Sequence, residues 1–214
     1  MKSRAFATII AIFIYCSLFV PKLEAQSYRS ELEVAPTDVY KAVFDYIEKK
    51  DYEKIRTALV YISPVIDTLK NKFGVELRLE IETALQKKDV PSLNATIRKL
   101  VFYDLWDTFN SIVKEGNSQP QDKLQAWLKL AYLDYLFLSP MVVAEKKGYA
   151  ADQEIKKIFK KAHDALGEYS PYTKEEKGSN LMQFAEYANQ IEGKCLELFP
   201  EFKSTVTGKR QTEP

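Results

Sequence analysis

Apolar residues recur along most of this chain at alternating spacings of three and four, which is the spacing of an amphipathic α-helix. The clearest stripe comprises Ile55, Leu59, Ile62, Ile66, Leu69 and Phe73. Comparable stripes predict helices that begin near Pro36, Asp51, Leu77, Pro91, Pro120 and Gly148, and a last helix that carries Leu181 and Phe184. Gly74, Gly116 and Gly148 are expected to end the three longest helices. We therefore predict an all-α fold, a helical bundle of about six or seven helices built from helical hairpins.

Two short segments occur twice. Tyr-Ile-Ser-Pro-Val-Ile at 61–66 resembles Phe-Leu-Ser-Pro-Met-Val at 137–142, and Lys-Lys-Asp occurs at 49–51 and, 38 residues later, at 87–89. Each Lys-Lys-Asp lies between a shorter and a longer predicted helix. This spacing suggests a duplicated helical hairpin. Chance is the alternative, because lysine and aspartate are common at helix junctions.

The two Ser-Pro pairs lie inside long apolar stripes. Proline in a helix interior removes one backbone donor and crowds a carbonyl, at a cost of about 3 kcal/mol. Each long helix must therefore kink at Pro64 or Pro140, or end and restart there with the serine as cap. Because the apolar register continues through both prolines, we predict Pro-kinked long helices.

The segment 120–147 is apolar on most of its sides, which predicts a helix at the centre of the bundle. A membrane span is the competing interpretation. Lys129, Asp134 and Pro140 all lie within the apolar run, and each is costly in lipid. The pattern therefore favours a buried helix, with no membrane span after the N-terminal segment is removed.

Residues 1–25 have the layout of a secretory signal peptide. Lys2 and Arg4 precede an apolar run, and Ala25 supplies the small residue before the expected cleavage point. An uncleaved N-terminal anchor is the alternative, although the run is short for a span. We predict a periplasmic or secreted protein with a loose leader at 26–35, a single helical domain at 36–203 and a disordered tail at 204–214.

The composition is that of a folded domain, with 46% hydrophobic and 29% charged residues. Without residues 1–25, 28 basic and 29 acidic residues remain, a net charge of −1. This balance gives no electrostatic argument for nucleic acid as a partner. Cys195 is then the only cysteine, so no disulfide can form within the chain. Its place on an apolar helical face favours a buried thiol over a bond to a second chain.

No familiar catalytic or cofactor motif is present. The chain lacks a haem-attachment motif, a glycine-rich phosphate loop and a nucleophile elbow. A single histidine, His163, cannot build the usual zinc or di-iron sites. We therefore expect no cofactor and no enzymatic activity.

Polar residues embedded in the apolar helices are the candidate site. The candidate ligand-binding residues are Tyr103, Asp104, Trp106, Asp107, Tyr132, Asp134, Tyr135 and Arg98. An unpaired buried carboxylate is very costly, so these aspartates need partners. A structural network with arginine, lysine or tyrosine is one interpretation, and a pocket between helices is another. Any metal site would use Asp104, Asp107 and Asp134.

The function that fits best is an exported, non-enzymatic binding or protein-interaction module that uses a groove beside the kinked helices. The alternative is a small-ligand or metal carrier that uses the buried Asp/Tyr cluster. An enclosed pocket at Asp104 or Asp134 would favour the carrier, whereas a large exposed apolar patch would favour the interaction module. The sequence identifies neither the protein or small-molecule partner nor the oligomeric state.

Overall fold

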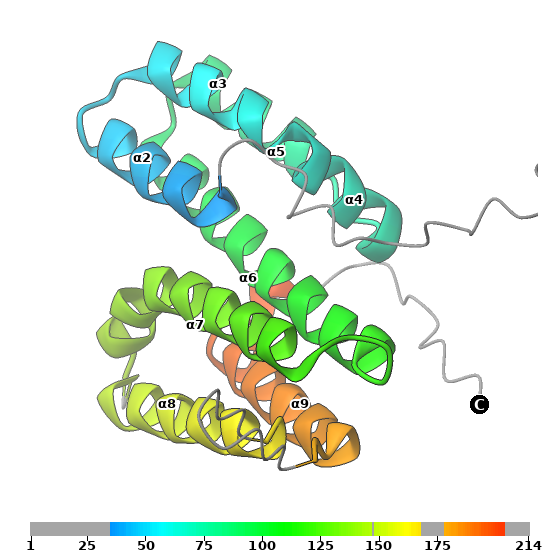
Figure 1. The fold of residues 1–214 in the computed structure, drawn as a ribbon. Coiled ribbons are helices and arrows are strands. Elements are labelled where there is room, and N and C mark those ends of the chain that lie inside the picture. The colour runs from blue at the N-terminus through cyan, green and yellow to red at the C-terminus, as the bar shows by residue number, and fades with distance from the viewer. Residues whose placement is uncertain (1–34, 147, 168–177, 204–214) are drawn as a thin grey trace, which may run out of the picture. The chain divides into compact units, whose positions relative to one another are not determined.

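The computed structural model describes residues 35–146, 148–167 and 178–203, and within them it contains eight α-helices, one 3-10 helix and no strand (Figure 1). They are α2 (Pro36–Glu48), α3 (Tyr52–Tyr61), α4 (Ser63–Phe73), α5 (Leu77–Lys87), α6 (Val90–Glu115), α7 (Gln121–Ala144), α8 (Gly148–Ala165), α9 (Leu181–Leu198) and η2 (Pro200–Phe202). The predicted all-α bundle is confirmed.

Three of the predicted segments lie outside the described residues. These are the signal peptide (1–25), the leader (26–35) except for its last residue, and the tail (204–214). The domain boundaries at 36 and 203 therefore stay a prediction. The described helices belong to one compact unit, Leu32–Pro214.

The two Lys-Lys-Asp segments adopt the same backbone geometry. Lys50 and Lys88 have positive φ angles of 56° and 53°. Each precedes an aspartate whose carboxylate caps the next helix: Asp51 accepts from the Lys54 N–H at 3.2 Å, and Asp89 from the Ser92 N–H at 3.1 Å. The Tyr52 hydroxyl donates to the Lys88 carbonyl oxygen at 3.3 Å. The repeated sequence therefore adopts the same local structure twice, and its two copies are in contact.

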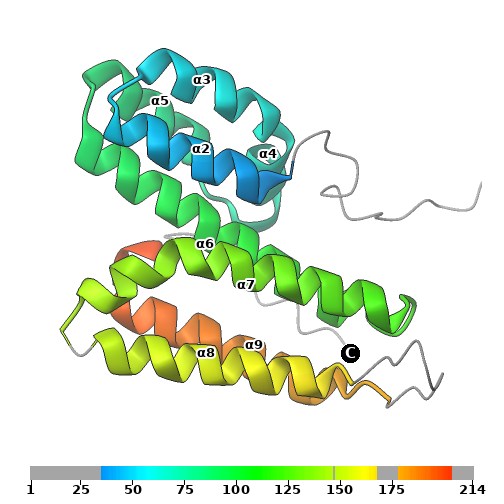
Figure 2. The ribbon, with the colours of Figure 1, turned by 60° about the vertical axis from the view of Figure 1, so that its left-hand side comes forward.

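The central helix is α6. It packs against α2, α4 and α5 on one side and against α7 and α9 on the other (Figures 1 and 2). The six successive residues 100–105 are all buried, so the middle of α6 is covered all round. We predicted this position for 120–147, but α7 keeps one side exposed. Apolarity alone misassigned the centre, because α7 is the more apolar helix and α6 the more enclosed one.

Aromatic side chains fill the space around α6. Toward α4, the ring of Trp106 packs on that of Phe73 with centroids 4.9 Å apart, and toward η2, Phe102 packs on Phe202 at 5.2 Å. Toward α8 and α9, Phe109 contacts Phe159 and Phe184. α6 therefore joins two aromatic clusters that come from distant parts of the chain.

The two Ser-Pro pairs fold differently. At Pro64 the helix is interrupted at one residue, Ile62 (φ −106°, ψ 14°), so 51–73 forms two helices instead of the single kinked helix that we expected. This interruption raises the helix count to eight. α7 continues through Pro140 as predicted, and its last turns are bent in Figure 2.

Gly148 does not end the third long helix. α7 ends at Ala144, and Gly148 is the first residue of α8. A Cβ atom at Gly148 would overlap the carbonyl oxygen of Val142. The turn between α7 and α8 therefore brings two backbone segments closer than any side chain allows.

Cys195 is buried within α9, as predicted, and its thiol is free. Burial raises its pKa to about 12, with a smaller contribution from the Glu192 carboxylate. The thiol is therefore protonated and shielded at neutral pH.

Candidate functional site

Two predicted carboxylates are fully buried, and both accept hydrogen bonds from α2. Asp104 on α6 accepts from the Tyr40 hydroxyl at 2.6 Å, and Asp134 on α7 accepts from the Thr37 hydroxyl at 3.0 Å. Burying a carboxylate without such partners costs several kcal/mol. The two bonds tie α2 to both long helices, which is the arrangement of a structural network.

Asp107 is held by a different helix. The Lys72 Nζ on α4 donates to both carboxylate oxygens of Asp107, at 2.7 Å and 2.9 Å. The carboxylate side is 3% exposed, whereas the lysine side chain is 47% exposed. This ion pair links α4 to α6 at the edge of the core.

The remaining candidates also face separate neighbours. The Tyr103 hydroxyl donates to the Phe202 carbonyl oxygen at 2.7 Å, and its ring stacks on Trp106. Tyr132 packs edge-on against Phe159 of α8, and Arg98 is half-buried on α6. The network interpretation named Arg98, Lys129 or tyrosines as partners: Asp104 does accept a hydrogen bond from a tyrosine, Tyr40, whereas Asp134 accepts one from a threonine, Thr37. The eight candidates thus share α6 and α7 without converging on one space.

No metal site is formed by the aspartates. Within residues 35–146, 148–167 and 178–203, no group of three or more His, Cys, Asp and Glu side chains is placed to hold a metal ion. Asp104 and Asp134 are instead bonded to α2, and Asp107 to α4.

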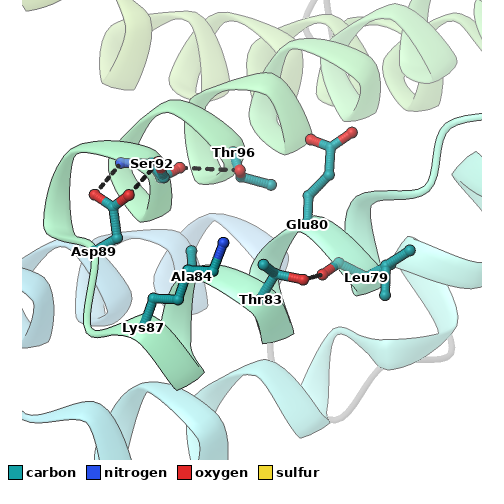
Figure 3. Close-up of a pocket in the computed structure, with 8 residues that line it drawn as sticks. All are labelled: Leu79, Glu80, Thr83, Ala84, Lys87, Asp89, Ser92 and Thr96. Atoms are coloured by element: carbon teal, nitrogen blue, oxygen red, sulfur yellow. Dashed lines mark hydrogen bonds between the residues drawn. The ribbon is translucent and has the colours of Figure 1, made fainter.

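A shallow groove lies between α5 and α6 (Figure 3). Its lining comprises Leu79, Glu80, Thr83, Ala84, Lys87, Asp89, Ser92 and Thr96. Three of the polar residues shown there bond to one another: the Ser92 hydroxyl donates to Asp89, and the Thr96 hydroxyl donates to the Ser92 carbonyl oxygen. The groove includes none of the predicted site residues, and Asp89, Ser92 and Thr96 use polar groups in bonds within the start of α6.

One buried carboxylate, Asp152 of α8, was missed by sequence reasoning. The Tyr135 and Ser139 hydroxyls of α7 donate to its Oδ1 at 2.8 Å and 2.6 Å, and Lys156 Nζ lies 2.7 Å from its Oδ2. The sequence did carry a signal, because Asp152 precedes Ile155 by three residues and so lies on the apolar face of its helix. These contacts clamp α8 to the residue before Pro140.

The electrostatics of this cluster follow from its hydrogen bonds. Burial alone would raise the pKa of Asp152, but the bonds from Lys156, Ser139 and Tyr135 outweigh it and hold the pKa below its usual value. Burial, reinforced by the Asp152 carboxylate, raises the pKa of Tyr135. At neutral pH the cluster is a charged carboxylate with neutral hydroxyl donors, and every carboxylate oxygen has a partner.

The outward side of α7 is apolar over several turns. Leu133, Leu136, Pro140 and Val143 follow a spacing of three, four and three, which places them on one face. We call these four residues the outer face of α7. Leu136 and Val143 are 38% and 43% exposed, and Pro140 is also exposed. Between Lys129 and Glu145 the only charged side chain is Asp134, which is buried.

By length and composition, α7 could cross a membrane, with a mean hydropathy of 1.2 over an 18-residue window. In this structure 44% of that window is buried within the protein. Asp134, Tyr135 and Ser139 make its bonds to α2 and α8. Such bonds are typical of a helix that packs in a protein core. One apolar side of this helix remains exposed.

Comparison of the chain with protein-family models, curated proteins and solved structures finds no match.

Proposed function

We propose that this protein is an exported, non-enzymatic binding module and that the outer face of α7 is its binding surface. The observation that carries the proposal is the absence of any exposed charged side chain on α7 between Lys129 and its last residue, Ala144. Single exposed apolar residues are ordinary, but a continuous apolar stripe is typical of an interaction site. This stripe spans about 15 Å from Leu133 to Val143 at 1.5 Å per residue.

A half-buried aromatic pair borders the outer face of α7. Phe44 of α2 stacks on Phe137 of α7, with ring centroids 6.0 Å apart and an interplanar angle of 19°. Both residues retain partial exposure. Aromatic side chains at a rim supply large contact area with little loss of rotamer freedom, which is common in protein interfaces.

The carrier alternative has less support. A carrier needs a cavity that reaches Asp104 or Asp134. The groove between α5 and α6 is lined by other residues, and so is a second groove beside Lys161 and Tyr187. Each carboxylate already accepts a hydrogen bond from α2. Both features fit a role for these aspartates in holding the helices together.

Export is inferred from the signal-peptide layout of residues 1–25. The expected mature protein begins at Gln26. N-terminal sequencing of the protein recovered from the host's exported fraction tests this inference. An intact Met1 on the recovered chain would contradict it.

Site-specific photo-crosslinking tests the binding surface. A benzophenone amino acid replaces Leu136 in one variant, and in the control it replaces Val60, which occupies the matching place before the first Ser-Pro and is 69% exposed. Irradiation in the host should give one discrete adduct, identified by mass spectrometry, from position 136 and none from position 60. Absence of an adduct at 136 in properly exported protein would refute the proposed function.

A further inference from the structure

We propose that the first turn of α8, residues 148–152, braces the proline hinge of α7, and that Asp152 is a positioning residue for the outer face of α7. We call residues 148–152 the α8 brace. Because the inference concerns the shape of that face, it rests on the proposed function. It follows from two attachments between α7 and α8 that lie on either side of Pro140.

Pro140 weakens α7 in the middle of its outer face. Proline has no backbone N–H, so the carbonyl oxygen of Leu136, four residues earlier, loses its usual helical donor. Sharp bends in helices occur at such positions, and the last turns of α7 are bent although the helix continues through Pro140 (Figure 2). Leu133 and Leu136 precede this point, and Val143 follows it. The angle at Pro140 therefore sets how the two halves of the face are oriented.

Asp152 holds the part of α7 that precedes the hinge. Its Oδ1 accepts hydrogen bonds from the Tyr135 and Ser139 hydroxyls at 2.8 Å and 2.6 Å, and the residue is 1% exposed. Lys156, one turn farther along α8, lies with its Nζ 2.7 Å from Oδ2. Hydrogen bonds to an ionised carboxylate are about twice as strong as neutral ones. These contacts fix Tyr135 and Ser139 against α8.

The turn between the two helices holds the part of α7 that follows the hinge. The Glu145 N–H donates to the Val142 carbonyl oxygen at 3.2 Å, and the Gly148 N–H donates to the Glu145 carbonyl oxygen at 2.7 Å. The backbone of Gly148 also lies against the Val142 carbonyl, where no side chain fits. Val142 is thereby fixed to the first residue of α8.

A single helical turn connects the two attachments. Gly148 and Asp152 are four residues apart, which is about 6 Å along a helix axis. Both lie in α8, whereas α7 lacks one backbone hydrogen bond at Pro140. The α8 brace therefore spans the hinge with a short continuous segment. Loss of either attachment would leave the angle at Pro140 free to vary.

A fixed bend would set the shape of the binding surface before a partner arrives. An interface that already has its bound shape avoids the entropic cost of becoming ordered on association. Without the α8 brace, the two halves of the outer face of α7 would reorient about Pro140. We therefore expect loss of Asp152 to weaken binding at this face about tenfold.

Distances across the hinge test the α8 brace. Nitroxide labels at A126C and A144C would lie on one side of α7, 18 residues and so five turns or about 27 Å apart. Double electron–electron resonance should give one narrow distance distribution without further substitution, and a distribution about twice as wide in D152A. The control D67A, which removes an exposed aspartate beside the first Ser-Pro, should leave the width unchanged. A narrow distribution in D152A would overturn the proposal.

A rescue variant separates a hinge effect from general loosening of the core. P140A restores the missing backbone N–H, so D152A/P140A should return to a narrow distribution. If D152A/P140A stays as wide as D152A, Asp152 holds the core as a whole and the proposal is wrong. If D152A does not fold, S139A carries the test, because it removes only the Ser139 contact. An unchanged width in S139A would then overturn the proposal.

Photo-crosslinking separates failure of this inference from failure of the proposed function. The adduct yield from position 136 should fall about tenfold in D152A and recover in D152A/P140A. If wild type gives no adduct while D152A widens the distance distribution, the proposed function fails and the α8 brace stands. If the adduct forms and D152A changes neither its yield nor the distances, the α8 brace fails and the binding surface stands.

Discussion

The two Ser-Pro regions begin from nearly the same sequence and reach different structures. Around Pro64 the helix stops at Ile62 and restarts, and the Ser63 oxygen accepts a 2.7 Å bond from Arg78 at an exposed site. Around Pro140 the helix continues, and the Ser139 hydroxyl donates to the buried Asp152. In both regions the serine contacts the helix that follows the turn.

The difference teaches that a proline determines where a helix is weakened, and the neighbouring helix determines what happens there. Asp152 receives hydrogen bonds from Tyr135 and Ser139, which precede Pro140 by five residues and one residue. This clamp ties that turn of α7 to α8. Arg78 and Asp67 form an exposed pair beside Ser63, and exposed ion pairs contribute little.

The largest effect should come from the turn that follows the second Ser-Pro. Gly148→Ala should destabilise the protein by about 4 kcal/mol or more, because the new Cβ overlaps the Val142 carbonyl and forces the backbone apart. Gly193→Ala is the matched control in α9, where a Cβ meets nothing within 4 Å. It should stabilise by about 0.5–1 kcal/mol. Urea unfolding measures both, and equal effects would contradict the close approach at Gly148.

Removal of the buried carboxylate should have the next largest effect. Asp152→Ala leaves two buried hydroxyls without their acceptor and should cost about 3 kcal/mol. Asp67→Ala, the counterpart near Ser63, should cost at most about 0.5 kcal/mol because its pair is exposed. Thermal and urea unfolding of the two variants give the comparison. Similar losses would show that the Asp152 contacts stabilise the protein no more than the Asp67–Arg78 pair does.

Substitution of the two serines should give the same ranking of stability losses, with smaller values than for the aspartates. Ser139→Ala removes one donor to Asp152 and should cost about 1–1.5 kcal/mol. Ser63→Ala should cost less than about 0.5 kcal/mol, because its bond with Arg78 is exchanged for water. Both changes in unfolding free energy follow from the shifts of the urea midpoints, provided that the slope m of the transition is unchanged. A larger loss at Ser63 would reverse the ranking of the two regions.

The smallest effect should be a pH dependence that belongs to the second region alone. The pKa of Asp152 is lower in the folded protein than in the unfolded chain. Its contribution is therefore complete above the unfolded pKa of about 4 and is lost as the pH falls through the folded value. Between pH 6 and pH 3, wild type should lose more stability than Asp152→Ala does. Parallel curves for the two proteins would contradict the lowered pKa.

Features that depend on neighbouring residues were predictable from the sequence. The helix start at Asp51 and the helix end at Gly74 were predicted correctly, because capping needs only three or four residues of chain. The fold class followed from the helical spacing of apolar residues.

Features that depend on distant contacts were not predictable. The partner of Asp104 is Tyr40, 64 positions away, and no local pattern specifies that pair. The central place of α6 depends on which helices cover it, and the more apolar α7 does not take it. Gly148 looked like a helix end, yet its role depends on the path of the backbone at Val142.

Under the export that we propose, the burial of Cys195 protects its thiol only after the chain has folded. Before folding, its sulfur is open to any oxidant or foreign thiol it meets; afterwards the core encloses it. The amount of protein that matures then depends on two rates: the rate at which α9 packs onto its neighbours and the rate at which the exposed thiol reacts. A variant that folds slowly would lose yield through mixed disulfides, even if its final stability were unchanged.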